Sequence, residues 1–419
     1  MTRIMISTFG TRGDIQPFIA LGKGLKTAGY EVAICTPEGF KPFVEEHGLH
    51  YLFMDNELLR LTQAVLDELG GIGEMMNIPS KMKSALRRSM DDEWNAARAF
   101  QPDLIIYHPK CFGGYHIAEK LHIPAIMSLP LPFYTPTRVF PVPFLSNIQL
   151  GQWFNRFSYR LILLPNLMYS GMVNDFRKKS LGLSPLGRFA NWLVRSDGSP
   201  VPVLYPYSQH ILPVPQDFPT HVHVTGYWFL DHAADWQPEP ELVRFLETGS
   251  VPIYIGFGSM GAGKGEQRVG IVLEALEKSG QRGVLVRGWG GLKASDLPKS
   301  VFMVESVPHD WLFPQMAAVV HHGGAGTTAA GLRSGKPSVI CPFMADQPFW
   351  ARLVYQQGAS PKPILQMHLE ADRLADAIIT AVQDKTMQNR AAELGQQIRA
   401  EDGIARAVEI IGAIINTAA

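Results

Sequence analysis

Residues 3–36 read RIMISTFGTRGDIQPFIALGKGLKTAGYEVAICT. The apolar run over residues 3–8 is typical of a buried strand, and a loop that contains glycine follows at residues 10–14. Apolar residues then recur at helical spacing over residues 16–28, and residues 31–36 form a second apolar run. A strand, a loop, a helix and a second strand in this order predict the repeating unit of an open parallel α/β sheet.

The same alternation continues along the chain. In the first half it is repeated at residues 103–107, 113–121 and 124–129. In the second half, short apolar runs alternate with helical patterns at residues 251–256, 283–287, 301–304, 319–321 and 338–342. We therefore expect two doubly wound, Rossmann-like α/β domains, one in each half of the chain.

Aromatic residues mixed with Asp, Pro and Glu over residues 226–240 indicate a linker between the two halves. We accordingly divide the chain into an N-terminal domain over residues 1–225, a linker over 226–245 and a C-terminal domain over 246–400. Residues 401–419 predict a closing amphipathic helix with the apolar series Ile404, Val408, Ile411 and Ile415.

The composition excludes several classes of protein. A chain of 419 residues with 46% hydrophobic and 18% charged residues can build large cores, which excludes intrinsic disorder. Thirty-eight Lys and Arg balance thirty-eight Asp and Glu, so the chain lacks the basic field that nucleic-acid binding requires. Cys35, Cys111 and Cys341 are too scattered for a disulfide framework or a zinc site. The N-terminus begins with a strand pattern rather than a secretion signal, and we expect a cytoplasmic protein.

Two phosphate-binding motifs occur in imperfect form in the second half. Three glycines that start at Gly256 have the G-x-G-x-x-G spacing, but the next strand ends without the acidic residue that would hold a ribose. Residues 258–264 resemble a P-loop, but Gly265 stands where a hydroxyl should reach magnesium. We expect Ser259 and its neighbouring amides to help to hold a phosphate; the alternative is a plain glycine turn.

A stronger motif is HHGGAGTT at residues 321–328, where an apolar strand runs through glycines into a helix. A helix N-terminus presents unpaired amides and the positive end of the helix dipole. We therefore predict that Ala325, Gly326 and Thr327 bind a diphosphate while His322 contributes a side-chain donor. The alternative is tight packing of the strand on the helix through the glycines.

Three polar side chains follow predicted strands, at the edge where open α/β sheets bind ligands. Asp346 and Gln347 follow the strand at residues 338–342, and a carboxylate beside an amide suits the hydroxyl groups of a sugar. Asp14 follows the first strand and is the candidate catalytic base. For both aspartates the alternative is a role as the N-terminal cap of the following helix.

These motifs, read in order, resemble those of the sterol 3-beta-glucosyltransferases, a branch of the UDP-glycosyltransferase superfamily (glycosyltransferase family 1). The resemblance spans nearly the whole chain. It rests on GTRGDIQPFIALG from Gly10, FYTPTRVFPVPF from Phe133, VNDFRKKSLGL from Val173, PIYIGFGSM from Pro252, RGWGGL from Arg287, VPHDWLF from Val307, HHGGAGTTAAGL from His321 and PF-x-x-DQPFW from Pro342. It implies the GT-B fold, with two facing Rossmann-like domains, an interdomain cleft and a final helix that packs back on the N-terminal domain. In this fold the N-terminal domain would bind the acceptor and the C-terminal domain the nucleotide sugar.

The resemblance also assigns roles to individual residues. Asp14 would be the base, and Thr11 and Arg12 would face the donor. In the C-terminal domain, Val307 and His309 would contact the nucleotide. The full set of expected donor-binding residues is Thr11, Arg12, Ser259, Val307, His309, His322, Ala325, Gly326, Thr327, Asp346 and Gln347.

The apolar, proline-rich segment over residues 130–154 predicts a hydrophobic slot for a flat alcohol such as a sterol, with an ordinary core as the alternative. Its prolines would interrupt any membrane-spanning helix. The expected acceptor contacts are Phe133, Tyr134, Phe140, Phe144 and Trp153. Five basic residues follow: Arg156, Arg160, Arg177, Lys178 and Lys179. They predict peripheral contact with anionic lipid at the inner face of the membrane, or else a solvated helix face.

The expected function is an inverting, metal-independent transfer of glucose from UDP-glucose to the 3-beta-hydroxyl of a sterol, with no cofactor besides this donor substrate. The chain has no Asp-x-Asp metal signature, so helix amides and His322 would stabilise the leaving diphosphate. One alternative is a glycosyltransferase for a polyketide, glycopeptide or phenolic acceptor with a UDP or dTDP sugar. An alternative of another class is a catalytically silent subunit that binds a nucleotide sugar.

Overall fold

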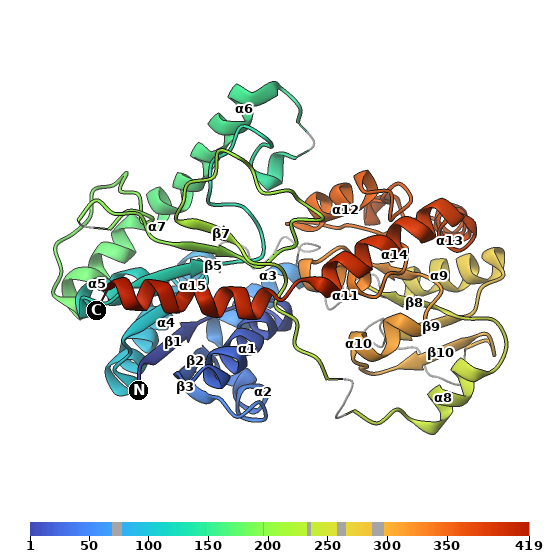
Figure 1. The fold of residues 1–419 in the computed structure, drawn as a ribbon, viewed down its shortest axis with the longest axis horizontal. Coiled ribbons are helices and arrows are strands. Elements are labelled where there is room, and N and C mark those ends of the chain that lie inside the picture. The colour runs from blue at the N-terminus through green and yellow to red at the C-terminus, as the bar shows by residue number, and fades with distance from the viewer. Residues whose placement is uncertain are drawn as a thin grey trace. The chain divides into compact units, whose positions relative to one another are not determined.

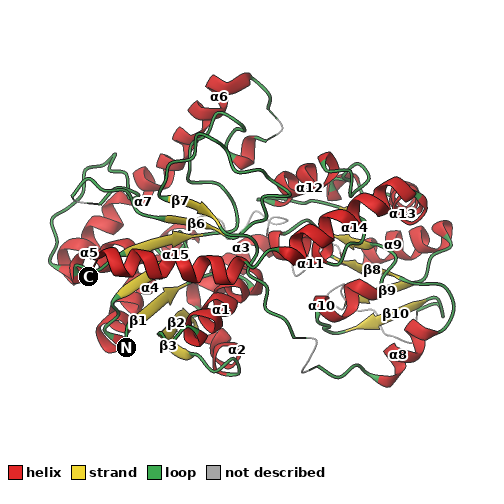
Figure 2. Cartoon of the chain, in the orientation of Figure 1, coloured by secondary structure: helices red, strands yellow, loops and turns green. Residues whose placement is uncertain are grey.

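Two parallel sheets organise the chain, and each belongs to its own compact unit (Figures 1 and 2). The computed structural model describes residues 1–68, 78–146, 148–195, 197–232, 236–257, 265–286 and 297–418. Unit 1 comprises Met1–Ser208, Val214–Leu230 and Asp402–Ala419, and unit 2 comprises Gln209–Pro213 and Asp231–Glu401. The predicted fold class, α/β with two doubly wound parallel sheets, is confirmed.

Unit 1 is built on a seven-stranded parallel sheet with the order β3-β2-β1-β4-β5-β6-β7. Its strands are β1 (Arg3–Ser7), β2 (Glu31–Pro37), β3 (His50–Met54), β4 (Leu104–Tyr107), β5 (Ala125–Ser128), β6 (Val203–Tyr205) and β7 (Val222–Val224). The strand order reverses between β1 and β4, so the loops after these two strands diverge at the switch point where open sheets bind ligands.

The apolar run of β1 makes it the centre of this sheet. Ile4, Met5 and Ile6 are fully buried, as expected of a strand that is covered on both faces. Ile4 pairs with Val32 of β2 on one side and with Leu104 of β4 on the other. The central position of β1 places the first turn of α1, which carries Asp14, at the middle of the sheet edge.

Helices connect the strands of unit 1. They are α1 (Arg12–Thr27), α2 (Lys41–Glu45), α3 (Glu57–Glu68), α4 (Ile78–Phe100), α5 (Gly114–Leu121), α6 (Gly151–Ser158), α7 (Leu163–Phe176) and α15 (Gly403–Ala418). Four short turns of helix are η1 (Glu38–Phe40), η2 (Pro143–Leu145), η3 (Tyr159–Ile162) and the π-helical η4 (Arg177–Leu181). The predicted helix over residues 16–28 starts earlier than expected, because Thr11 caps it and Arg12 is its first residue.

The last helix, α15, packs against α1 in unit 1 although it follows all of unit 2 in the sequence. Ala407 and Ile411 of α15 are fully buried in the core that Ile4 and Ile6 also form. The two helices approach closely at Gly24, where a Cβ atom would lie 2.3 Å from Cγ2 of Ile404. Gly24 therefore allows α15 to cover α1.

Unit 2 is built on a five-stranded parallel sheet with the order β10-β9-β8-β11-β12. Its strands are β8 (Ile253–Gly256), β9 (Gly283–Val286), β10 (Val301–Val304), β11 (Val319–His321) and β12 (Ser338–Ile340). Its helical elements are α8 (Pro240–Glu247), α9 (Gly265–Ser279), α10 (His309–Leu312), η7 (Phe313–Gln315), α11 (Ala325–Arg333), α12 (Gln347–Gln356), η8 (Gln366–His368), α13 (Ala371–Gln383) and α14 (Lys385–Ala400). Here the strand order reverses between β8 and β11, so the HHGG segment after β11 also lies at a switch point.

The described residues of the proline-rich apolar segment over 130–154 form an extended loop, η2 and the start of α6. None of the described helices combines the length and the apolar character that are needed to cross a bilayer.

Candidate active site

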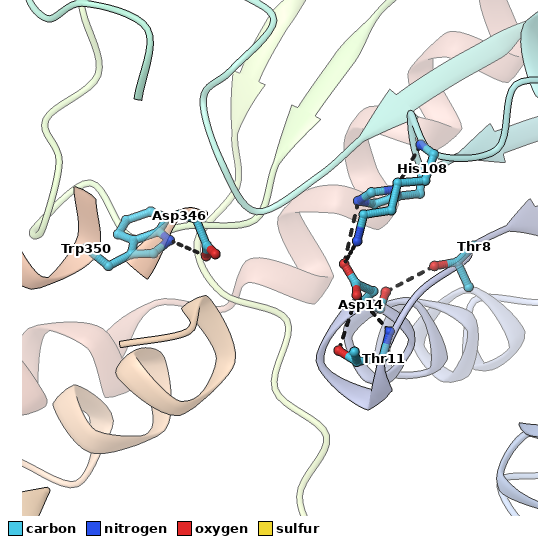
Figure 3. Close-up of polar contacts among 7 residues, drawn as sticks. Thr8, Thr11, Asp14, His108, Asp346 and Trp350 are labelled. Carbon is cyan, nitrogen blue, oxygen red and sulfur yellow. Dashed lines mark hydrogen bonds and ion pairs between the residues drawn. The ribbon is translucent and has the colours of Figure 1, made fainter. Parts of the chain in front are cut away.

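Asp14 lies in the first turn of α1, directly after β1 in unit 1 (Figure 3). Its Oδ2 accepts a hydrogen bond from the backbone N–H of Thr11 at 2.8 Å and another from the Thr11 hydroxyl at 3.2 Å. A carboxylate at the third helical position that binds the N-cap backbone is half of a capping box. Asp14 therefore stabilises the helix start with one oxygen and directs the other, Oδ1, elsewhere.

Gly10 makes room for the Asp14 carboxylate. A Cβ atom at residue 10 would lie 2.1 Å from Oδ2 of Asp14, which is far inside van der Waals contact. The backbone of Gly10 also has φ +141°, a conformation that residues with a side chain rarely adopt. Steric space and backbone conformation both require glycine here.

Two residues from the loop after β4 complete the surroundings of Asp14 (Figure 3). Nζ of Lys110 donates a hydrogen bond to Oδ1 of Asp14 at 2.7 Å, and Nε2 of His108 lies 4.0 Å from the same oxygen. The backbone N–H of Lys110 donates to Nδ1 of His108 at 3.1 Å. A neutral His108 must then carry its proton on Nε2, the nitrogen nearer to Asp14.

The charges in this cluster keep Asp14 ionised. Burial raises the pKa of the Asp14 carboxyl, but the Lys110 ammonium, His108 and the hydrogen bonds from Lys110 and Thr11 outweigh burial, and the net pKa is below its ordinary value. Burial, helped by Lys110, lowers the pKa of His108 to about 3. At neutral pH the cluster therefore consists of a carboxylate, an ammonium and a neutral imidazole, and the carboxylate is free of a proton.

His108 and Lys110 are absent from the residues predicted from the sequence. They follow the apolar run over residues 103–107, which is itself a predicted strand. The signal that could have identified them is the rule that adjacent strands at a switch point share a ligand edge. Applying that rule requires the strand order, which places β4 beside β1.

Thr11 and Arg12, the predicted donor contacts of unit 1, are exposed. Nε of Arg12 donates to Oε1 of Gln16 at 3.3 Å, and its guanidinium carbon lies 4.7 Å from the centroid of the Phe43 ring. These contacts hold both side chains near the N-terminus of α1. Their contact with a donor stays a prediction.

In unit 2, one glycine brings two predicted motifs together. Gly323 has φ +89°, and a Cβ atom there would lie 2.8 Å from Cγ2 of Ile340 and 3.2 Å from the backbone oxygen of Gln347. The loop between β11 and α11 therefore packs directly against the first residue of α12. The HHGG segment and the Asp-Gln pair, which lie 24 residues apart at His322 and Asp346, meet at one end of the sheet.

The N-terminus of α11 has the features that anion binding requires. Its N-cap residue is Gly324, which has no side chain to satisfy the first amides of the helix, those of Ala325, Gly326 and Thr327. Gly326 is exposed, and a Cβ atom there would meet nothing within 4 Å. The helix start is therefore accessible, and its first amides, which no side chain of the described residues caps, favour a negatively charged ligand.

His322 lies beside this helix start. Burial lowers its pKa to about 4, although a hydrogen bond to the backbone of Gly256 opposes this shift, so His322 is neutral at pH 7. Its Nδ1 is buried and has no hydrogen-bond partner among the described residues. The bond to Gly256 therefore uses Nε2, and a neutral imidazole carries a single N–H, so His322 can donate from Nδ1 to an anionic ligand only when the ring changes tautomer and gives up the bond to Gly256.

Asp346 and Gln347 differ in their accessibility to a ligand. Oδ2 of Asp346 accepts a hydrogen bond from Nε1 of Trp350 at 3.1 Å (Figure 3). Asp346 occupies the N-cap position of α12, but its side chain makes no capping hydrogen bond. Gln347 is buried, and its Oε1 accepts hydrogen bonds from the backbone N–H of Phe343 at 2.7 Å and of Met344 at 3.3 Å. Gln347 thus shapes the loop that precedes Asp346.

The remaining predicted nucleotide contacts lie in or near the core of unit 2. The side chain of Val307 is buried, so its backbone is the part that can reach a nucleotide. The His309 ring stacks on Phe313, with centroids 4.2 Å apart. Trp311 packs against Trp236 at 4.8 Å. Ser259 lies outside the described residues.

The predicted acceptor residues separate into two groups. Phe133, Tyr134 and Phe140 are half-buried around a small core of Val142, Tyr159 and Ile162. Phe144 and Trp153 are exposed instead. The first group therefore lies in a packed aromatic cluster. Phe144 is on the surface but packs against Phe133, with ring centroids 4.9 Å apart, and Trp153 is on the surface.

Comparison with known proteins identifies two domain families. Residues 4–141 match the glycosyltransferase family 28 N-terminal domain, and residues 290–414 match the erythromycin biosynthesis protein CIII-like C-terminal domain. Among solved structures, the glycotransferase of kitacinnamycin superposes with a TM-score of 0.74 at 19% identity, over 99% of both chains. The glycosyltransferase VinC in complex with DTDP superposes with a TM-score of 0.67 at 18% identity, over 100% of this chain and 99% of its own. These likenesses establish the GT-B fold.

Two curated relatives are much more similar in sequence. The sterol 3-beta-glucosyltransferase UGT80A2 of Arabidopsis thaliana is 38% identical over 419 aligned residues, which are 97% of this chain and 64% of the plant protein. Sterol 3-beta-glucosyltransferase UGT80B1 of the same plant is 37% identical over 418 residues, 97% of this chain and 67% of the plant protein. The chain thus spans about two thirds of the length of these relatives. It belongs to the sterol 3-beta-glucosyltransferase family of the UDP-glycosyltransferase superfamily.

Proposed function

We propose that this protein transfers glucose from UDP-glucose to the 3-beta-hydroxyl of a sterol or a similar flat hydrophobic alcohol, with inversion at the anomeric carbon. Family membership supports the glucosyl donor and the sterol acceptor. The observation that carries the mechanism is the ionised Asp14 carboxylate at the switch point of the first sheet.

Asp14 would act as the general base. One carboxylate oxygen accepts the proton of the acceptor hydroxyl while the hydroxyl oxygen forms a bond to the anomeric carbon. The bond between that carbon and the diphosphate oxygen breaks, and UDP leaves with the electron pair. An alcohol is a poor nucleophile at neutral pH, and a positioned base contributes roughly 10²–10⁴-fold to the rate.

The diphosphate would bind at the N-terminus of α11. The amides of Ala325, Gly326 and Thr327, which no side chain of the described residues caps, together with His322 would stabilise the charge that builds on the leaving group. Asp346 would hold sugar hydroxyls, and Val307 and His309 would contact the nucleotide. Neutral donors in this arrangement add no formal positive charge, so the helix dipole would carry most of the stabilisation.

The reaction would need no divalent metal, because helix amides would take the place of a cation at the diphosphate. Activity in the presence of EDTA tests this proposal. A rate that falls to background in EDTA and returns with Mg²⁺ would contradict it.

Incubation of the protein with UDP-glucose and separate sterol and phenolic acceptors, with UDP release and product mass as readouts, tests the whole proposal. We expect a sterol hexoside from the wild type, and a loss of at least about 10²-fold in turnover for Asp14→Asn with unchanged UDP binding. A hexoside of phenolic acceptors alone would move the protein to the natural-product glycosyltransferases. UDP binding without turnover on any alcohol would favour a silent binding subunit.

A further inference from the structure

Exposed apolar side chains are concentrated on one segment of unit 1, which comprises η2, α6, η3 and the start of α7. In the described part of the chain nineteen large hydrophobic side chains are exposed, and nine of them lie within residues 139–168. The nine are Val139, Phe144, Ile148, Leu150, Trp153, Phe157, Leu161, Leu164 and Met168. We call these residues, with the arginines between them, the α6 surface. Single exposed hydrophobic residues are normal, but a cluster of this size marks an interaction site.

Trp153 and Phe157 form the most prominent part of the α6 surface. Trp153 is 76% exposed, and its ring stacks on that of Phe157 with centroids 5.0 Å apart and an angle of 10° between the planes. Both belong to α6, which stands at the top of Figure 1, away from the sheet of its own unit. An aromatic pair that is exposed to water contributes little to the stability of the fold, because its rings bury little apolar area. Aromatic side chains are enriched at the interface of a bilayer, where such a pair would be buried.

The charged side chains of the α6 surface itself are all basic, and the exposed carboxylate of Asp217 lies beside them and interacts with Arg156. Residues 120–174 contain no Asp or Glu, whereas Arg138, Arg156 and Arg160 are exposed. The guanidinium of Arg160 lies 5.0 Å from the centroid of the Phe157 ring, so it borders the aromatic pair. Asp217, which approaches from the loop before β7, binds the hydroxyl of Thr137 and the backbone N–H of Arg138. The α6 surface is therefore apolar with basic residues among its apolar groups.

Arg177 is not part of this surface, and its predicted role in lipid contact is wrong. It is 2% exposed, and its guanidinium donates to the Glu119 carboxylate at 2.6 and 3.2 Å. A second contact joins Nη1 of Arg177 to Nδ1 of His116 at 3.1 Å. Arg177 thus forms a buried ion pair with Glu119, and this pair fixes η4 against α5.

A surface cavity of about 740 Å³ opens within the α6 surface. Its lining combines Tyr134, Trp153 and Phe157 with all three exposed arginines, Arg138, Arg156 and Arg160. A sterol is neutral and has one hydroxyl, so it does not need three guanidinium groups. Phosphate groups bind guanidinium well, often through two parallel hydrogen bonds.

We propose that the α6 surface docks on a bilayer of anionic phospholipid, with Trp153, Phe157 and their apolar neighbours in the interface and the three arginines on lipid phosphates. Apolar groups supply affinity by leaving water, and the arginines add selectivity for negative charge. This proposal does not depend on the identity of the sugar or the acceptor. It places unit 1 on the phase in which a hydrophobic alcohol resides.

Flotation with vesicles tests the proposal. Vesicles of phosphatidylcholine alone are compared with vesicles that contain phosphatidylglycerol, for the wild type and two double variants. We expect the wild type to bind the anionic vesicles and to bind the neutral ones much less. Trp153→Ala/Phe157→Ala should lower the partition coefficient at least about 10-fold, since each ring buries apolar area. Arg156→Gln/Arg160→Gln should lower it by about 25-fold on anionic vesicles only, about 5-fold for each charge.

Matched controls come from unit 2. Leu365 and Met367 are 43% and 78% exposed, close to the 44% and 76% of Phe157 and Trp153. Leu365→Ala/Met367→Ala and Arg244→Gln/Arg373→Gln should therefore leave vesicle binding unchanged. Equal binding to neutral and anionic vesicles, or an equal loss in test and control variants, would overturn the proposal.

Two further measurements separate membrane docking from self-association. Brominated phosphatidylcholine in the anionic vesicles should quench the fluorescence of the wild type, and Trp153→Phe should lose most of that quenching while it retains binding. Analytical ultracentrifugation without lipid should give the same molecular mass for the wild type and for Trp153→Ala/Phe157→Ala. A dimer that this double variant dissociates would show that the surface is covered by a second copy of the chain.

Discussion

At the scale of single residues, Lys110 is the group that most directly controls the proton affinity of the proposed base. Its ammonium lies 2.7 Å from Oδ1 of Asp14 and lowers the pKa of that carboxyl. A lower pKa keeps Asp14 ionised to more acidic pH, but it also makes the carboxylate a weaker base. The ion pair with Lys110 therefore keeps Asp14 ionised over a wider pH range but lowers the basicity of its carboxylate.

Replacement of Lys110 should move the acid limb of the pH–rate profile. Turnover requires ionised Asp14, so the rate falls as the pH drops through the pKa of Asp14. Lys110→Met removes the nearby positive charge, and we expect the acid limb of kcat/KM to move to higher pH by about one pH unit or more. Lys110→Arg keeps the charge and should retain the wild-type profile. Identical acid limbs in the Met variant and the wild type would show that Lys110 has no influence on the base.

Gly10 offers a steric test of the same site. The Cβ atom of Gly10→Ala would lie 2.1 Å from Oδ2 of Asp14, so the carboxylate must rotate away from its position. We expect kcat to fall by roughly 10²-fold, the order of a lost general base. Gly13→Ala is the matched control, because its Cβ atom would meet only Oγ1 of Thr11, at 3.7 Å. Similar losses of kcat in the two variants would contradict a specific role for the space at Gly10.

At the scale of elements, the two helix starts that follow the switch points have different chemistry. Asp14 closes the N-terminus of α1 with its own carboxylate. The N-terminus of α11 begins at Gly324 and has no side-chain cap. The first helix thus presents a negative group to a ligand, whereas the second presents free amides. A catalytic base needs a carboxylate, whereas an anion-binding site needs N–H donors, so the two proposed sites require different helix starts.

A carboxylate introduced at residue 326 should have opposite effects on stability and on donor binding. Nothing lies within 4 Å of a Cβ atom at Gly326, so Gly326→Asp can be accommodated. An acidic residue in the first turn stabilises a helix by about 0.3–1 kcal/mol, so the melting temperature should stay equal or rise. The same charge should repel a diphosphate and weaken UDP binding at least about 10-fold. Calorimetric titration with UDP measures the affinity.

Gly326→Ala is the control for this experiment, because it adds a methyl group without charge. It should keep most of the affinity for UDP. Wild-type affinity in the Asp variant would exclude the α11 N-terminus as the diphosphate site.

At the scale of the whole molecule, each unit has its own core and its own set of buried ionisable groups. In unit 1, burial lowers the pKa of His108 and of His116 to about 3 and raises the pKa of Glu93 to about 8. The ordinary values are about 6.5 for His and about 4.3 for Glu. The unfolded state therefore binds more protons than the native state through the histidines and fewer through Glu93.

These shifts predict a maximum in the stability of unit 1 near pH 6.5. The histidines make the fold less stable as the pH falls from about 6.5 towards 3, because the imidazoles of the unfolded state take up protons. Glu93 lowers the free energy of unfolding as the pH rises from about 4.3 to 8, by up to about 1.4 kcal/mol for each pH unit, because the unfolded carboxyl ionises first. Among these three groups, the two histidines outweigh Glu93 below pH 6.5, and only Glu93 acts between pH 6.5 and pH 8. Calorimetric melting between pH 4 and pH 9 measures this profile.

Glu93→Gln should remove the decline between pH 6.5 and pH 8. Its melting temperature should exceed that of the wild type by an amount that grows from pH 5 to pH 8. A difference that stays constant with pH would show that Glu93 is ionised in the native state.

Local sequence patterns predict much of this protein. The alternation of apolar strands and helices is a short-range property, and it predicts the two parallel α/β sheets. Motifs that extend from strand to helix, such as residues 10–14 and 321–328, likewise predict where ligands bind, because a strand end and a helix start are set by neighbours in sequence. The family itself is visible in these motifs.

Only the tertiary structure shows which distant side chains meet. His108 and Lys110 reach Asp14 because β4 pairs with β1, a contact between residues that are 96 positions apart for Lys110. Arg177 looks like its basic neighbours in the sequence, but packing against Glu119 and His116 buries it. Trp153 looks like a core residue, but it lies on the surface. Periodicity states that a residue is apolar or charged; strand order and long-range packing decide what it touches, because those contacts depend on the whole chain.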